Sequence, residues 1–114
     1  MSRTYVLIGG NSGIGRAFAE REESRGNTVM AFARNAADTG HISGVDFHNF
    51  NATDFSAQPV LPEKIDGLMY MPGTIKLKPF HRQTIDDFRE EMDINFLGAV
   101  NIIQRALSGL KKGD

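Results

Sequence analysis

The stretch that decides the fold lies near the start of the chain and reads Tyr5-Val6-Leu7-Ile8-Gly9-Gly10-Asn11-Ser12-Gly13-Ile14-Gly15. Its first four residues are a short apolar run of β-formers, which is typical of a buried parallel strand. The glycines predict a tight turn into a helix, and Gly26 is placed to cap the end of that helix. A second buried strand is predicted at residues 28–33. The chain therefore begins with a βαβ unit.

The glycine turn has the residue types that a pyrophosphate-binding turn needs. A helix N-terminus attracts phosphate through its unpaired N–H groups, provided that no side chain intervenes. Gly9 permits a sharp exit from the strand, Gly13 removes a blocking Cβ, and Gly15 lets the helix pack on the strand. The spacing G-x-x-x-G-x-G differs from the general pattern G-x-G-x-x-G, so an ordinary glycine-rich turn is the alternative. The position between a buried strand and an amphipathic helix favours a dinucleotide.

The end of the second strand predicts which dinucleotide is bound. An acidic residue there binds the ribose 2′-hydroxyl of NAD, whereas an arginine accepts the 2′-phosphate of NADP. The sequence has Ala33-Arg34-Asn35 at this point, and the first acidic residue after the strand is Asp38. Arg34 is therefore the predicted phosphate ligand, and NADP(H) rather than NAD is the predicted cofactor. A solvated surface arginine is the alternative.

The rest of the chain predicts two further strands and one long helix. The strands are residues 46–51 and 65–71, and glycine or proline in the segments before them predicts short, irregular crossovers. Thr84 begins a capping-box pattern, which predicts a helix start. The helix, which reaches Lys112, is apolar over so much of its circumference that it needs two packing partners. Its apolar positions include Phe88, Met92, Phe96, Ala99, Ile103, Ala106 and Leu110.

Composition excludes several classes of function. The chain has 114 residues, 40% of them hydrophobic, which predicts one domain spanning residues 1–114. A net charge of -1 gives no basic surface for nucleic acid, and no apolar run approaches the ~18 residues of a membrane span. Without cysteine there is no thiolate site, and a cytoplasmic location is expected. The scattered His41, His48 and His81 predict no metal site.

Taken in order, several segments resemble the short-chain dehydrogenase/reductase family. Residues 6–15 look like its T-G-x-x-x-G-I-G turn, with Ile8 in place of the threonine. Ala33-Arg34-Asn35 looks like its NADP-type strand end, and Asn51-Ala52-Thr53-Asp54 resembles the D-V-T-D segment beside the adenine. Residues 68–73 occupy the place of N-N-A-G, of which only Gly73 remains.

The resemblance implies a Rossmann-type α/β fold. Its parallel sheet has the strand order 3-2-1-4 and lies between helical layers, and it is truncated after the long helix. The implied cofactor-binding residues are Gly9, Asn11, Ser12, Gly13, Ile14, Gly15, Arg34, Asn51, Ala52, Pro72 and Gly73.

Asn95 is the one candidate catalytic residue. Its spacing from Met92 and Ala99 places it on the apolar helix face, where a buried asparagine must find hydrogen-bond partners. Residues 93–98, D-I-N-F-L-G, resemble the segment that carries the family's catalytic asparagine, which orients a water next to a catalytic lysine. A structural asparagine at a local helix irregularity is the alternative.

The family's remaining catalytic residues, a serine and the motif Y-x-x-x-K, follow the long helix. Tyr5 and Tyr70 are the two tyrosines of the chain, and neither is followed four residues later by lysine. Two hypotheses remain. The chain is the cofactor-binding part of an oxidoreductase that transfers hydride between NADP and a carbonyl or alcohol, or it is a free-standing, non-catalytic nucleotide-binding or self-assembling module.

The predicted fold leaves two apolar surfaces without a partner. The fourth strand forms a bare edge of the sheet, and the long helix has a second apolar face that the sheet does not cover. We therefore expect the chain to associate with itself through one or both surfaces.

Overall fold

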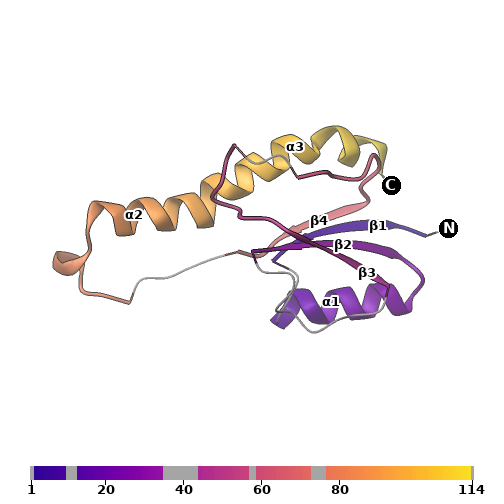
Figure 1. Ribbon diagram of the computed structural model, residues 1–114, viewed down its shortest axis with the longest axis horizontal. Coiled ribbons are helices and arrows are strands. Elements are labelled where there is room, and N and C mark those ends of the chain that lie inside the picture. Colours follow the sequence, from indigo (N-terminus) through magenta and orange to yellow (C-terminus); the bar gives the residue numbers. More distant parts are fainter. Residues whose placement is uncertain (1, 10–12, 35–43, 57–58, 73–76, 114) are drawn as a thin grey trace.

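The structure is a computed structural model that describes residues 2–9, 13–34, 44–56, 59–72 and 77–113. Its strands form one parallel sheet in the order β3-β2-β1-β4, as the sequence predicts (Figure 1). The strands are β1 (Thr4–Ile8), β2 (Thr28–Ala33), β3 (Val45–Asn49) and β4 (Gly67–Tyr70).

Helices cover both faces of the sheet, which confirms the three-layer α/β arrangement. Helix α1 (Gly13–Ser24) packs on one face and helix α3 (Gly98–Lys112) on the other (Figure 1). Successive residues of β1 alternate between the two faces. Leu7 therefore belongs to the core under α1, and Ile8 belongs to the core under α3.

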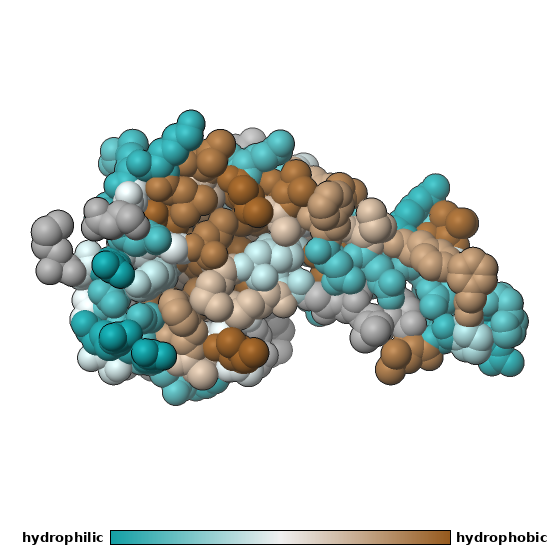
Figure 2. All heavy atoms as spheres, turned by 180° about the vertical axis from the view of Figure 1, so that it is seen from behind, coloured by the Kyte–Doolittle hydropathy of each residue, from teal (hydrophilic) through white to brown (hydrophobic). Residues whose placement is uncertain are grey.

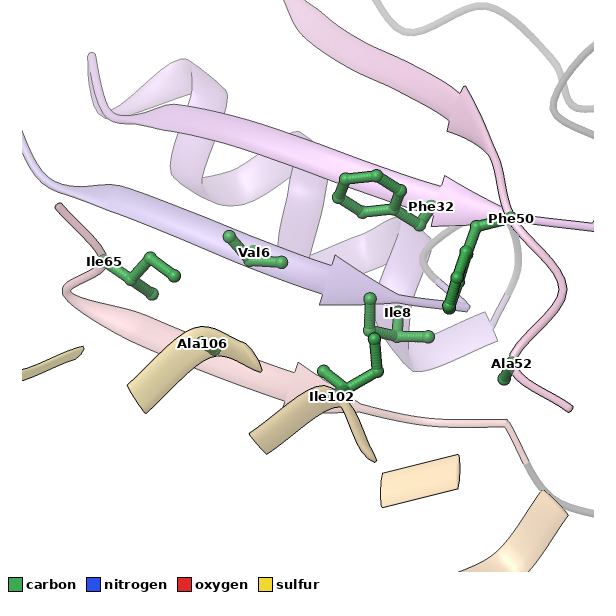
Figure 3. Packing of buried hydrophobic residues seen from close by; sticks show 8 residues of the cluster. All are labelled: Val6, Ile8, Phe32, Phe50, Ala52, Ile65, Ile102 and Ala106. Carbon is green, nitrogen blue, oxygen red and sulfur yellow. The ribbon is translucent and has the colours of Figure 1, made fainter. Parts of the chain in front are cut away.

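The core under α3 is the larger of the two. Figure 3 shows Ile102 of α3 beside Ile8 of β1, with Phe32 and Phe50 at the same end of the cluster. The rings of Phe32 and Phe50 meet edge to face, with centroids 6.1 Å apart. The buried members of this core are Val6, Ile8, Phe32, Phe50, Ala52, Ile65, Ile102 and Ala106.

The predicted long helix is present, but its hydrogen bonding changes partway along. It begins with helix α2 (Ile85–Met92), where Thr84 and Asp87 form the predicted capping box. A π-helical segment, Asp93–Leu97, then joins α2 to α3. None of the residues of α2 is buried, because α2 extends beyond the sheet (Figure 1). The described residues accordingly span 53 × 30 × 20 Å.

The crossover between β3 and β4 is irregular, as predicted. Residues 50–56 and 59–66 contain turns and bends and no helix. Most of the crossover between β2 and β3 falls on residues 35–43, which lie outside the described residues. In the part of the chain that the structure describes, no helix is long and apolar enough to cross a membrane.

Candidate functional site

The candidate site lies at the edge of the sheet where the parallel strands end. Ligands of open α/β sheets bind at this carboxyl edge, because helix N-termini and strand ends meet there. The sequence places a candidate residue just after each strand: Gly9 after β1, Arg34 after β2, Asn51 after β3 and Pro72 after β4. The fold therefore brings candidate residues from four separate segments to one edge.

Gly9 makes the sharp exit from β1 that the sequence predicts. Its φ of +86° lies in the left-handed region, which favours glycine. A Cβ at this position would lie 3.3 Å from the backbone nitrogen of Pro72. The Gly9 N–H donates to the carbonyl of Phe32 at 2.7 Å, so the turn is attached to β2 as well.

The N-terminus of α1 lies at the same edge (Figure 1). Gly13 begins the helix with a φ of +58°, and a Cβ added there would meet no described atom within 4 Å. Ile14 is 79% exposed, whereas Gly15 is buried against the sheet. The first turn contains no acidic residue that would repel a phosphate. The predicted ligands Asn11 and Ser12 lie outside the described residues.

Arg34 is exposed directly after β2, where a 2′-phosphate ligand is expected. Asn51 is also exposed, and its Oδ1 accepts hydrogen bonds from the N–H of Thr53 at 3.0 Å and the hydroxyl of Thr53 at 2.8 Å. Ala52 is buried in the core under α3, and Pro72 is half-buried after β4. Gly73 lies outside the described residues.

Asn95 is exposed, so the expectation that it is buried is wrong. It lies in the π-helical segment, which joins α2 to α3, and its neighbours Met92 and Phe96 are 53% and 54% exposed. The buried face of the long helix begins only at Gly98. The predicted alternative, an asparagine at a local helix irregularity, describes its position in the helix.

Tyr70 is a residue of this edge that the sequence analysis did not single out. Its hydroxyl donates to the carbonyl of Ile94 in the π-helical segment at 2.5 Å. Burial raises the pKa of Tyr70 above its ordinary value, so the phenol stays protonated and able to donate. The signal in the sequence is Gly98, whose missing side chain makes room for the tyrosine hydroxyl.

Within the described residues, no three side chains of histidine, aspartate or glutamate lie close enough together to hold a metal ion. Among the described candidate residues at the carboxyl edge, the polar groups are instead the first backbone N–H groups of α1, the Arg34 guanidinium and the Asn51 side-chain amide. This set suits a phosphorylated organic ligand.

Comparison with known proteins identifies the family. The sequence model of the family described as short chain dehydrogenase matches residues 3–114. The chain therefore belongs to the short-chain dehydrogenase family, as its ordered motifs predict. The family is one that binds NAD(P), and one structurally similar short chain dehydrogenase has been solved with bound NAD+.

Individual relatives match almost the whole chain but only part of their own length. A 3-dehydrosphinganine reductase of Arabidopsis thaliana is 30% identical over 96% of this chain, which covers 37% of that protein. A 3-oxoacyl-[acyl-carrier-protein] reductase of Mycobacterium avium is 28% identical over 98% of the chain, which covers 46% of that protein. The chain thus spans less than half the length of these relatives.

Solved structures show the same fold. Ligand-free aldohexose dehydrogenase of Thermoplasma acidophilum superposes with a TM-score of 0.81 at 19% identity, covering 96% of this chain and 44% of that one. A short chain dehydrogenase of Leptospira borgpetersenii with bound NAD+ superposes with a TM-score of 0.77 at 17% identity, covering 92% of this chain and 44% of that one.

Proposed function

We propose that the carboxyl edge of this chain binds NADP(H) as the cofactor-binding part of a short-chain oxidoreductase. The observation that carries the proposal is the open N-terminus of α1, reached through a left-handed Gly9 and a side-chain-free Gly13. The pyrophosphate would accept hydrogen bonds from the first backbone N–H groups of α1. The space that a side chain of residue 13 would enter holds no described atom within 4 Å.

Arg34 would select the phosphorylated cofactor. Its guanidinium follows β2, is exposed, and can form a bidentate contact with the 2′-phosphate. A hydrogen bond to a charged group contributes about 1.5–3 kcal/mol, which corresponds to roughly a tenfold to hundredfold preference for NADPH over NADH. The solved short chain dehydrogenase with bound NAD+ supports a nicotinamide cofactor. The preference for a 2′-phosphate rests on Arg34 alone.

The experiment is a titration of the chain with NADPH and NADH, repeated on Arg34→Ala. We expect the substitution to weaken NADPH binding and to leave NADH binding nearly unchanged. Arg21→Ala is the matched control, because Arg21 is exposed in the last turn of α1, far from the helix N-terminus. Equal affinity of the unsubstituted chain for the two cofactors would contradict the assignment of Arg34.

The full reaction would move a hydride between the nicotinamide and a carbonyl or alcohol carbon. This step needs a proton donor whose pKa is lowered by a neighbouring cation. Tyr5 and Tyr70 lack a lysine four residues later, so we assign that role to neither. Asn95 would hold a water near the proton path. We therefore expect the 114-residue chain to bind cofactor without turnover, and steady NADPH oxidation with carbonyl substrates would contradict this.

We also propose that the chain associates with itself. Among the described strands, β4 pairs only with β1, so its outer edge is unpaired. Figure 2 shows hydrophobic residues gathered over the part of the molecule where α3 lies. Phe96, Val100, Ile103 and Leu107 are 54%, 36%, 47% and 48% exposed. A stable interface through these surfaces would bury more than ~1,000 Å² in total.

A further inference from the structure

A hydrogen bond from Tyr70 to Ile94 joins the end of the sheet to the π-helical segment. Tyr70 is the last residue of β4, and Ile94 lies in the π-helical segment, beyond the buried part of the long helix. No residue of the π-helical segment is buried. The tyrosine hydroxyl is therefore a specific polar contact between the end of the sheet and this segment.

The accepted carbonyl is one that the π-helical register leaves without its usual donor. In an α-helix the N–H of Gly98 would donate to the carbonyl of Ile94, four residues earlier. Here it donates to the carbonyl of Asp93, five residues earlier. Because a π-helical turn is rarer and less stable than an α-helical one, its persistence calls for a compensating contact. The Tyr70 hydroxyl supplies one to that carbonyl.

The glycine that ends the π-helical segment fits the tyrosine. A Cβ on Gly98 would collide with the Tyr70 hydroxyl oxygen. The same Cβ would also lie 3.1 Å from the carbonyl oxygen of Ala52 and 3.0 Å from that of Asp93. Gly98 is buried, and two of these three neighbours are backbone oxygens, which cannot rotate away as a side chain can. The hydroxyl thus reaches the helix only because position 98 has no side chain.

The hydrogen-bond register of the π-helical segment sets how the preceding helix residues are rotated about the helix axis relative to α3. One extra residue in a turn rotates the preceding residues by about 100° relative to α3. Asn95 and the whole of α2 would therefore change direction if the segment relaxed to an α-helix. We propose that Tyr70 is a positioning residue, whose hydroxyl holds Asp93–Leu97 in the π-helical register and so fixes the direction in which Asn95 is presented. Only the role of Asn95 in this statement rests on the proposed function.

The test reads the register directly by NMR on the chain labelled with 15N and 13C. Scalar couplings across hydrogen bonds show which carbonyl accepts the Gly98 N–H. In the unsubstituted chain we expect a coupling from Gly98 to Asp93. In Tyr70→Phe we expect the coupling to move to Ile94, together with a change in the shifts of the Asn95 side-chain NH2. A Gly98–Asp93 coupling that survives in Tyr70→Phe would overturn the proposal.

The chain provides a matched control and a second variant. Tyr5 packs edge to face on Phe18, with ring centroids 5.3 Å apart, so Tyr5→Phe removes a hydroxyl far from the helix. We expect that variant to keep the Gly98–Asp93 coupling. Should Tyr70→Phe fail to fold, Gly98→Ala displaces the hydroxyl by collision, and position 98 should then couple to Ile94. A position-98 coupling that stays with Asp93 in that variant overturns the proposal equally.

The same experiment separates this inference from the proposed function. The couplings are measured without cofactor, so they report on Tyr70 whether or not NADPH binds. A register that depends on Tyr70 in a chain that binds neither NADPH nor NADH would contradict the proposed function alone. If the Gly98–Asp93 coupling survives in Tyr70→Phe while the unsubstituted chain binds NADPH, the positioning role alone would be contradicted.

Discussion

Asp66 and Thr4 hold the start of β4 against β1 through two reciprocal hydrogen bonds. The Asp66 N–H donates to the Thr4 carbonyl at 2.8 Å, and the Thr4 N–H donates to Asp66 Oδ2 at 2.7 Å. The Asp66 side chain is 1% exposed, so neither bond is exchanged easily for water. This pair helps to fix the register of β4, and with it the place where Pro72 meets Gly9.

Removing the Asp66 carboxylate should therefore destabilise the fold. Asp66→Ala leaves the part-buried N–H of Thr4 without its acceptor, which costs about 1–3 kcal/mol of unfolding free energy. Urea denaturation followed by circular dichroism measures the loss. Asp46→Ala is the control, because the Asp46 side chain is 61% exposed where it contacts His48, and the loss of that contact should cost under ~1 kcal/mol. Equal losses in the two variants would show that the buried pair contributes nothing special.

The Tyr70 hydroxyl should lose its proton at a higher pH than an ordinary tyrosine does. Burial raises its pKa in the folded chain above that in the unfolded chain, where it is about 10. A raised folded-state pKa favours the protonated form, so the associated stability is present below pH ~10 and is lost as the pH rises through the folded-state pKa. The tyrosinate absorbance of the chain minus that of Tyr70→Phe isolates this group. A midpoint at or below the ordinary value would contradict the buried, donating phenol.

A charge on the exposed face of α3 should abolish self-association. Ile103 and Leu107 are about half-exposed, so Ile103→Glu with Leu107→Glu places two carboxylates in the proposed interface with little effect on the core. Sedimentation velocity should show an oligomer for the unsubstituted chain and a monomer for this variant. Ser108→Glu adds a charge at an exposed position of the same helix that the helical period turns away from the apolar row, and it should leave the oligomer intact. A monomeric unsubstituted chain at high concentration would contradict the interface.

Local signals were enough to predict much of the fold. β2 occupies residues Thr28–Ala33 as predicted, because a run of β-formers between two breaks has few alternative structures. The capping box at Thr84 was predictable for a similar reason, since both of its hydrogen bonds join residues three apart. The strand order followed from the family resemblance and is borne out by the sheet.

The features that the sequence left unpredicted depend on tertiary contacts. A regular period of 3.6 residues places Asn95 with Ala99 and Ala106, but the π-helical segment adds a residue and rotates the two halves of the helix apart. Asn95 is exposed in this segment. The contact between Tyr70 and Ile94 joins residues 24 positions apart, and Gly98, the one trace of it in the sequence, does not indicate its partner. The contacts assigned to the cofactor-binding residues stay predictions.

The most direct test of the dinucleotide turn compares two glycines of the same helix. Gly13 and Gly26 flank α1, both have positive φ, and an added Cβ meets no described atom within 4 Å at either position. Alanine should therefore cost about 1–2 kcal/mol of stability at each. By calorimetric titration with NADPH, Gly26→Ala should bind like the unsubstituted chain, and Gly13→Ala should bind at least about tenfold more weakly. Equal NADPH affinities of the two variants would contradict a pyrophosphate site at the glycine turn.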